Sequence, residues 1–248
     1  MVGQSRRTSG ACHMLENVST AVMTALGLIR SLDGDLLAIV GLSLRVSLAA
    51  VGIAALLGLP FGAAVAVWRF PGRQVVIVIL NALMGLPPVV VGLAVYLVLS
   101  RAGPLGAFGL LFTPTAMVLA QSLLVLPIIA AFTRQTIADL YEEYAEQFSS
   151  WGVSPGRAMG TLLWDGRFRL GTALLAGFGR ASAEVGAVMI VGGNIRHATR
   201  VMTTTIALET SKGNLPLALA LGLILMLLVL TVNTAAMVLQ ERGRRVHG

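Results

Sequence analysis

The sequence of 248 residues has few charged side chains. Arg, Lys, Asp and Glu together make up 12% of it, whereas 56% belongs to the hydrophobic class. A soluble domain of ordinary composition carries about a quarter charged residues, because its water-facing surface is built from them. The low charge therefore argues against a soluble enzyme.

Lysine is almost absent. Of the 18 basic residues 17 are arginine, and the single lysine, Lys212, is followed by Gly213. A nucleotide-binding P-loop needs Gly-Lys-Ser/Thr, so the chain has none and we expect it not to be an ATPase itself. The net charge of +7 is spread over single arginines among apolar runs rather than gathered in a stripe, which argues against nucleic acid as a partner.

Residue types that bind metals are equally scarce. The single Cys12 allows no internal disulfide and no cysteine-based zinc site. Three histidines, His13, His197 and His247, lie far apart in the sequence and form no metal-binding motif. We expect no metal site and no cofactor bound by this chain.

What the sequence does contain is long apolar runs. A helix that crosses a bilayer needs about 20 consecutive, mostly apolar residues. Five runs meet that length: 46–68, 74–100, 113–133, 170–193 and 215–237. We therefore predict an all-α polytopic membrane protein with five spans.

The first 35 residues have a different pattern. Apolar side chains recur there at helical spacing, with polar residues such as Glu16 and Asn17 between them. This pattern predicts an amphipathic helix that lies at the membrane interface. A span formed by residues 14–32 is the alternative, and it would move the N-terminus to the other side. The expected organisation is an N-terminal segment (1–35), a membrane domain (36–240) and a basic tail (241–248).

The basic residues predict the orientation in the membrane. Nine arginines fall in the tail, in the 69–73 connection and in the long polar loop 134–169, against four basic residues in the opposite loops. Cytoplasmic loops carry the excess of Arg and Lys. We place the long loop and the C-terminus in the cytoplasm and the N-terminus outside.

The loop 134–169 reads as helix, tight turn, helix. Ser154 is a natural helix N-cap with Pro155 at the first helical position. Large apolar residues stand among its charges, and such groups on a surface indicate a docking site for a partner. These are Phe148, Trp151, Leu162, Leu163 and Trp164. A solvated connector is the alternative.

The same loop resembles the EAA loop of permease subunits in ATP-binding-cassette (ABC) importers. Glu146, Gly152 and Leu162 match its acidic, glycine and apolar positions. Three residues depart from the pattern: Gln147 and Phe148 replace its alanines, and Asp165 replaces its proline.

Further segments resemble the same family. Residues 179–189 are similar to a segment of molybdate-type permeases, and 190–200 with 202–210 resemble the tungstate branch. Residues 70–73 and 84–92 fit the same group. The likeness covers nearly all of 36–240 and is strongest to the tungstate-specific permeases of the type I importers. Molybdate or another oxyanion is the alternative cargo.

The resemblance implies a set of partners. Two copies of the permease form the pathway, two separate ATPase subunits use ATP and Mg beneath them, and an extracytoplasmic oxyanion-binding protein delivers the cargo at the inner membrane. The loop 134–169 would then be the coupling loop that seats on the ATPase. Its expected contact residues are Glu143, Glu146, Gly152, Ser154 and Pro155.

Two charges fall inside the fourth apolar run. Arg180 and Glu184 are four residues apart, which predicts that they lie on one helix face. Charges at membrane depth face a bundle interior, a cavity or each other, so a mutually neutralising structural pair is one interpretation. The resemblance implies the other, a position of Glu184 near the gate or the subunit interface. The residues expected at the gate or pathway are Arg180, Glu184, Gly186, Pro87 and Pro88.

Some alternatives remain open at this stage. Pro87-Pro88 predicts either a simple kink or a bend that lines the pathway, because irregular backbone at depth must face protein or water. Arg196, Arg200 and Lys212 could dock the binding protein or face lipid headgroups. A membrane-embedded enzyme and a secondary transporter are remote alternatives, since the clustered acids of the loop have no nearby histidine and no inverted repeat is evident.

Overall fold

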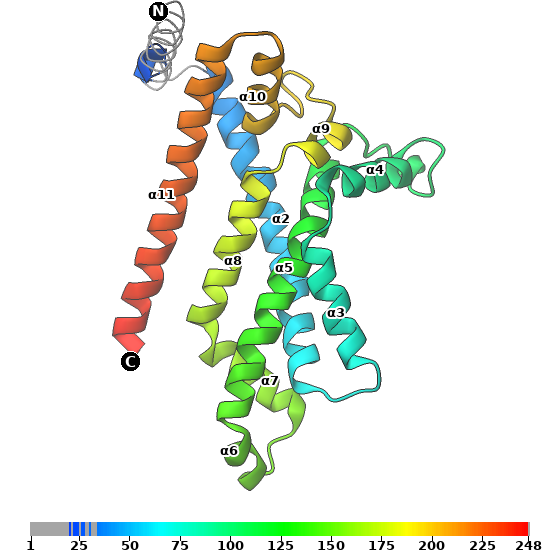
Figure 1. Cartoon of the computed structure of the whole chain (residues 1–248), viewed down its shortest axis with the longest axis vertical. Coiled ribbons are helices and arrows are strands. Elements are labelled where there is room, and N and C mark those ends of the chain that lie inside the picture. Colours follow the sequence, from blue (N-terminus) through cyan, green and yellow to red (C-terminus); the bar gives the residue numbers. More distant parts are fainter. Residues whose placement is uncertain (1–19, 21, 25, 28–29, 31–33, 248) are drawn as a thin grey trace, which may run out of the picture.

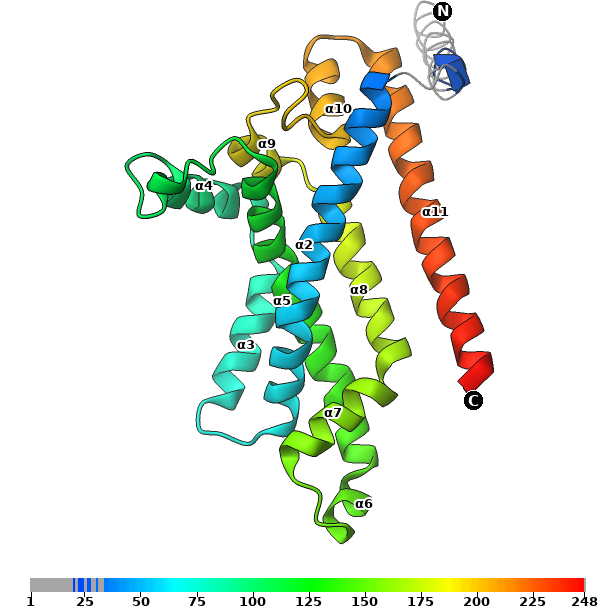
Figure 2. The same cartoon turned by 180° about the vertical axis from the view of Figure 1, so that it is seen from behind.

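A computed structural model describes residues 20, 22–24, 26–27, 30 and 34–247, with side chains through residue 242. From residue 34 to 247 all regular elements are helices and no strand occurs (Figures 1 and 2). The predicted amphipathic helix of the first 35 residues, and whether 14–32 span, lie largely outside the described residues.

Three helices are long and apolar enough to cross a membrane. They are α2 (Gly34–Val67), α5 (Pro114–Glu143) and α11 (Leu215–His247). The sequence predicted a first span that begins at residue 46, but α2 begins twelve residues earlier. Similarly, α5 continues ten residues beyond the predicted end of the third span. The α2 extension is itself mostly apolar, whereas the α5 extension is polar and carries the helix beyond the apolar run.

Two further spans are bent pairs of helices. The pair α3 (Arg73–Met84) and α4 (Pro88–Leu99) bends by 101° at residues 85–87, which we call the first break. The pair α8 (Arg167–Ser182) and α9 (Gly186–Gly192) bends by 60° at residues 183–185, the second break. Counting each pair as one span, the all-α fold has the five predicted spans.

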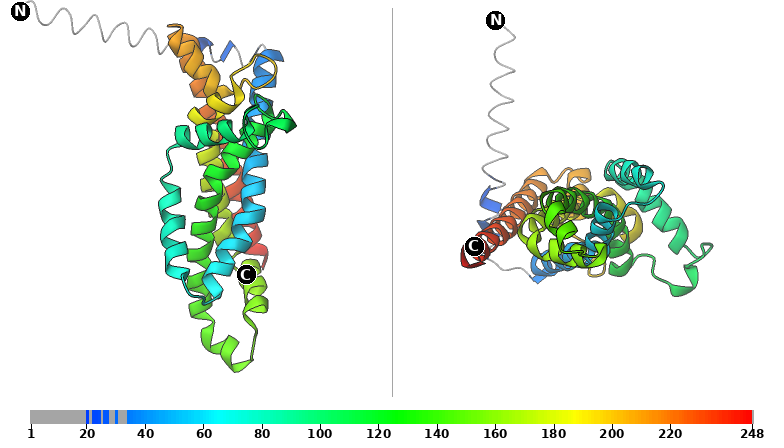
Figure 3. Two further views of the ribbon diagram at one scale, coloured as in Figure 1. Left: turned by 90° about the vertical axis from the view of Figure 1, so that its right-hand side faces the viewer. Right: turned by 90° about the horizontal axis from the view of Figure 1, so that it is seen from below.

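The short elements lie at the two ends of the bundle. At one end are α6 (Ala145–Ser150) and α7 (Pro155–Asp165), which lie in the loop 134–169 that is predicted to couple to an ATPase and that we call the coupling loop (Figure 1). At the opposite end are α4, α9, α10 (Met202–Ser211) and the 3-10 turn η1 (Gly106–Phe108). A side view (Figure 3, left) shows α5, in green, running between these ends through the middle of the bundle.

The second break corrects the prediction of one continuous helix over 170–193. That run contains no proline, so nothing in its composition predicts an interruption. The first break was expected from Pro87-Pro88, but a 101° bend is far more than a kink. Because of this bend, α4 lies roughly at right angles to the long helices and projects sideways from the bundle, so it does not continue the line of α3 (Figure 2).

The turn between α2 and α3 is closed by one side chain. The Arg73 guanidinium donates from Nε to the Val65 carbonyl at 2.7 Å and from Nη2 to the Ala66 carbonyl at 3.1 Å. The last carbonyls of a helix have no partner within it, and an arginine there also complements the helix dipole. Arg73 therefore caps α2 and fixes the hairpin.

Glycines let α2 and α5 pack at short range. A Cβ added at Gly58 would lie 3.2 Å from the Ile129 Cγ2 atom. A Cβ at Gly62 would overlap the Ala130 carbonyl oxygen and lie 2.9 Å from the Thr133 Cβ atom. Small residues at such positions allow helix backbones to approach closely in membranes. The α2–α5 pair is therefore the close-packed centre of the bundle.

We predict that Gly62→Ala lowers the free energy of unfolding by about 1–3 kcal/mol, because the new methyl group forces α2 and α5 apart. The matched control is Gly52→Ala in the same helix, where no described residue lies within 4 Å of the added Cβ. The control should be neutral or stabilising by up to about 1 kcal/mol. Thermal unfolding of the detergent-solubilised protein measures both, and equal midpoints for the two variants would contradict the packing argument.

Candidate functional site

The two helix breaks lie against each other. A Cβ added at Gly92 of α4 would lie 2.6 Å from the Ala187 Cα atom of α9. A Cβ added at Gly186 would lie 2.8 Å from the Val89 Cγ2 atom. The start of α4 and the start of α9 are thus in direct contact at the end of the bundle opposite the coupling loop (Figure 1).

Glu184 is the buried charge at this junction. Its side chain is only 3% exposed, and its Oε2 atom lies 2.7 Å from the Arg180 Nη1 atom. Its Oε1 atom accepts a hydrogen bond of 3.0 Å from the backbone N–H of Ala187. The carboxylate therefore serves as an ion-pair partner and as the cap of the first turn of α9.

The predicted pair forms, but not on one helix face. Arg180 lies in the last turn of α8, which ends at Ser182, and Glu184 lies in the second break. A cation at a helix C-terminus and an anion at a helix N-terminus both complement the helix dipoles. The pair thus stabilises the end of α8 and the start of α9 together, which gives the break a physical reason.

The backbone of the second break is bonded to two other helices. The Ala181 carbonyl accepts a hydrogen bond of 3.1 Å from Gln121 Nε2 of α5. The Glu184 carbonyl accepts one of 2.8 Å from Thr203 Oγ1 of α10. Irregular backbone at membrane depth needs such partners inside the protein. Gln121 thus supports the last turn of α8, and Thr203 supplies a partner for the Glu184 carbonyl in the break.

The sequence interpretation missed both of these residues. Gln121 could have been identified from the sequence, since it is the one amide side chain in the apolar run 113–133. A polar group at that depth needs a partner. Thr203 could not have been identified in this way, because it is one of three consecutive threonines that the sequence does not distinguish. The contact over 19 residues that distinguishes it exists only in the fold.

The first break places its two prolines at the start of α4. Pro87 is the N-cap residue, with φ −64° and ψ 121°, and Pro88 is the first helical residue. Proline suits that position because its missing N–H would have no helical partner anyway. The next residue, Val89, is the one that meets Gly186. The predicted pathway candidates Glu184, Gly186 and Pro88 are therefore brought close together.

The three basic residues predicted to dock the binding protein are not gathered in one place. Arg196 Nη2 pairs with Asp35 Oδ2 at 2.7 Å, and Arg200 donates to the Asn194 carbonyl at 3.5 Å. Both line a pocket of about 150 Å³ beside α2. Lys212 is the C-cap residue of α10 and pairs with Glu209 at 2.8 Å. That hydrogen bond lowers the pKa of the Glu209 carboxyl.

The coupling loop has the predicted form of helix, turn and helix. Glu143 ends α5, and Glu146 lies in the first turn of α6. Gly152 has a φ of +60°, a left-handed conformation that glycine adopts without strain. Ser154 is the N-cap of α7 and Pro155 its first residue, as predicted, although the Ser154 side chain makes no capping hydrogen bond.

The apolar residues of the loop divide into a packed set and an exposed set. Phe148 packs against the rings of Tyr141 and Tyr144, with centroids 6.1 and 6.0 Å away, and Leu162 is fully buried. The prediction of a docking surface is therefore wrong for Leu162, whereas Phe148 and Leu163 are only partly buried, and their docking role stays a prediction. Trp151 and Trp164 remain 74% and 71% exposed, and the Arg167 guanidinium covers the Trp164 ring at 4.8 Å.

The departure Asp165 also has a local role. Its Oδ2 atom accepts a hydrogen bond of 3.1 Å from the Tyr144 hydroxyl, and this bond raises the pKa of the Tyr144 phenol. The contact ties the end of α7 to the residue that follows α5. Together with Leu162 and Phe148, it joins the loop to α5 as one packed unit.

Among residues 34–242 no three His, Cys, Asp or Glu side chains are grouped to hold a metal ion.

Comparison with known proteins gives close relatives. The chain is 44% identical over 221 residues to a probable anion ABC transporter permease protein of Haloferax volcanii, covering 86% of this chain and 95% of that relative. It is 37% identical over 227 residues to the tungstate uptake system permease protein TupB of Peptoclostridium acidaminophilum, covering 92% and 100%. The TupB of Campylobacter jejuni is 37% identical over 166 residues, covering 67% and 70%. No protein-family model matches the chain.

We predict that Arg180 and Glu184 are energetically coupled. In a double-mutant cycle of Arg180→Met and Glu184→Gln, the second substitution should cost less once the first has removed its partner, with a coupling energy of about 1–3 kcal/mol. Unfolding of the detergent-solubilised protein by sodium dodecyl sulfate gives the four free energies. If the two substitutions change the free energy of unfolding additively, the ion pair between Arg180 and Glu184 makes no contribution to stability.

Proposed function

Because this chain belongs to the family of ABC transporter permeases, we propose that it forms the membrane pathway of an ATP-driven oxyanion importer whose cargo is tungstate. The choice of tungstate as the cargo rests on the sequence identity of 37% to the Peptoclostridium tungstate permease, over the whole length of that relative. The apolar helices of the fold agree with a multi-pass protein of the inner membrane.

The sequence around the single lysine indicates which subunit of the importer hydrolyses ATP. Since Lys212 is followed by Gly213, ATP and Mg are used by a separate ATPase subunit in this proposal. Two copies of that subunit bind a pair of these chains on the cytoplasmic side, and an extracytoplasmic binding protein delivers the anion. The coupling loop, at the end with α6 and α7, faces the ATPase (Figure 1).

Coupling needs a rigid path from that loop to the two breaks, and α5 supplies one. Its cytoplasmic end is packed against the loop through Tyr144 and Leu162. Near its other end Gln121 bonds the last turn of α8. About 33 Å of unbroken helix separates Gln121 from Glu143 at 1.5 Å per residue. A displacement of the loop therefore reaches the second break without passing through a flexible connection.

The gate in this proposal is the contact between the two breaks. Glu184 is not proposed as a ligand, because a carboxylate would repel an oxyanion. Paired with Arg180 it is neutralised, and it fixes the orientation of α9 against α4. Movement of either helix start would open or close the contact between Gly186 and Val89.

The proposed orientation rests on the distribution of arginine. The end with the coupling loop is cytoplasmic, and the end with α4, α9 and α10 is outside. Helix α2 begins at the outer end, while α11 descends toward the cytoplasm (Figure 3). The start of α2 is then extracytoplasmic and the end of α11 cytoplasmic; the N-terminus is extracytoplasmic if residues 14–32 lie at the interface, as predicted, and cytoplasmic if they span.

We predict that Gly152→Trp abolishes binding of the ATPase subunit and uptake of tungstate, because a large side chain at the turn between α6 and α7 blocks its seat on the ATPase. The affinity-tagged chain is expressed with its importer partners. Recovery of the ATPase with the tag is measured together with cellular tungsten and molybdenum. The wild-type chain should recover the ATPase and accumulate tungsten in preference to molybdenum.

Gly109→Trp is the matched control. Gly109 has the same left-handed backbone, with a φ of +59°, and lies at the opposite end of the protein. At both positions no described residue lies within 4 Å of an added Cβ. The control should bind the ATPase and transport normally. A wild-type chain that recovers no ATPase would refute the proposed function, whereas normal uptake by Gly152→Trp would refute only the role of the loop.

A further inference from the structure

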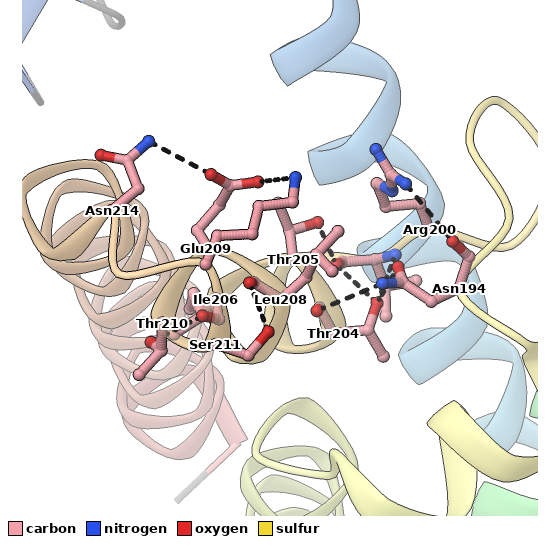
Figure 4. Close-up of polar contacts among 12 residues, drawn as sticks. Asn194, Arg200, Thr204, Thr205, Ile206, Leu208, Glu209, Thr210, Ser211 and Asn214 are labelled. Atoms are coloured by element: carbon pink, nitrogen blue, oxygen red, sulfur yellow. Dashed lines mark hydrogen bonds and ion pairs between the residues drawn. The ribbon is translucent and has the colours of Figure 1, made fainter.

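The segment that follows the second break is held together by its own side chains. The Thr199 hydroxyl donates to the Gly192 carbonyl at the end of α9 and accepts from the Ile195 N–H at 3.0 Å. The Thr204 hydroxyl donates to Asn194 Oδ1 at 3.0 Å (Figure 4). Thr199 and Thr204 are fully buried. The end of α9, residues 193–201 and the start of α10 are thereby one hydrogen-bonded unit, which we call the outer cap.

Thr203 closes this unit onto the second break. Its hydroxyl donates at 2.8 Å to the carbonyl of Glu184, the residue that carries the buried carboxylate. That carbonyl lies outside both α8 and α9 and would otherwise need another partner, because a buried carbonyl without a hydrogen bond is costly. The chain from Glu184 through α9 and residues 193–201 to Thr203 therefore forms a closed ring.

The outer cap is also attached to α2. The N–H of Met202 donates to the Ser43 hydroxyl at 2.9 Å, and Arg196 pairs with Asp35 at the start of α2. Arg196 and Arg200, on the outward-facing connection, belong to the same unit. A displacement of residues 193–201 is therefore transmitted through α10 and the Thr203 hydrogen bond to the backbone of Glu184.

We infer that Thr203 is a positioning residue that transmits docking of the oxyanion-binding protein on the outer cap to Glu184 in the second break. The inference rests on the proposed function, since it presupposes an importer with a binding protein and an ATPase. Without the Thr203 hydroxyl, the Glu184 carbonyl loses its link to α10. Glu184 is then linked to the outer cap only through α9, whose first turn its carboxylate caps, and no longer directly to α10.

The test uses the assembled importer in lipid vesicles, with the partner ATPase. ATP hydrolysis is measured with and without the binding protein loaded with tungstate. Thr203→Val keeps the shape of the side chain and removes its hydroxyl, and the stimulation of hydrolysis by the binding protein should fall by about fivefold or more. Hydrolysis without the binding protein should stay within about twofold of wild type, because a coupling between two sites leaves the basal rate in place.

Two variants separate positioning from general destabilisation. Thr203→Ser restores the hydroxyl and should restore the stimulation. Thr205→Val makes the same chemical change in the same helix, but the Thr205 hydroxyl bonds only within its own turn, to the Val201 carbonyl at 2.7 Å. Thr205→Val should therefore be stimulated like wild type.

Wild-type stimulation of Thr203→Val, or equal loss in Thr205→Val, overturns the inference. If Thr203→Val yields no assembled importer, Thr203→Ala removes the same hydroxyl with less bulk. Failure of both to assemble while Thr203→Ser assembles means that the hydroxyl is needed for folding, and this also overturns the inference. A wild-type chain that assembles no importer refutes the proposed function instead.

Discussion

The structure depends on how a helix is interrupted inside an apolar layer. Where α8 stops at Ser182 and α9 starts at Gly186, several backbone groups lose their helical partners, and lipid offers none. The carboxylate of Glu184 meets part of this need by capping α9 while its charge is balanced by Arg180. Gln121 and Thr203 add hydrogen bonds from two other helices, to the Ala181 and Glu184 carbonyls. The geometry of the break thus depends on hydrogen bonds from α5 and α10 as well as on its own residues. It therefore changes when either of these helices moves.

This arrangement connects the two ends of the protein. From the cytoplasmic end, α5 carries the packed coupling loop to the break through Gln121. From the outer end, the outer cap reaches it through Thr203. Opposite the break, the bent α4 rests on α9 through glycine contacts that leave no room for a methyl group. The proposed gate is therefore controlled from both sides of the membrane at a single small junction.

Much of the fold follows from composition and local pattern. The apolar runs predict the spans, Pro87-Pro88 predicts the first break, and Ser154-Pro155 predicts the start of α7. The second break could not be predicted, because Ala183, Glu184 and Val185 include no proline or glycine and the contacts that hold the break are tertiary. Glu184 was singled out for its charge, yet the helical spacing assumed for its pair with Arg180 was wrong. Contacts such as that between Arg196 and Asp35, 161 positions apart, carry no local signal at all. The same holds for the packing of Phe148 against Tyr141 and Tyr144, which only the folded loop brings to it.

The central claim is that Glu184 and the junction of the two breaks form the gate. The most direct measurement is ATP-driven tungstate uptake by vesicles that contain the importer with Glu184→Gln, compared with wild type at equal amounts of assembled complex. Glutamine keeps the shape and an acceptor for the Ala187 N–H but removes the charge that holds Arg180. The account predicts that uptake falls about tenfold or more, which corresponds to about 1.4 kcal/mol or more in the rate-limiting step. Wild-type uptake by an importer that assembles normally would contradict it.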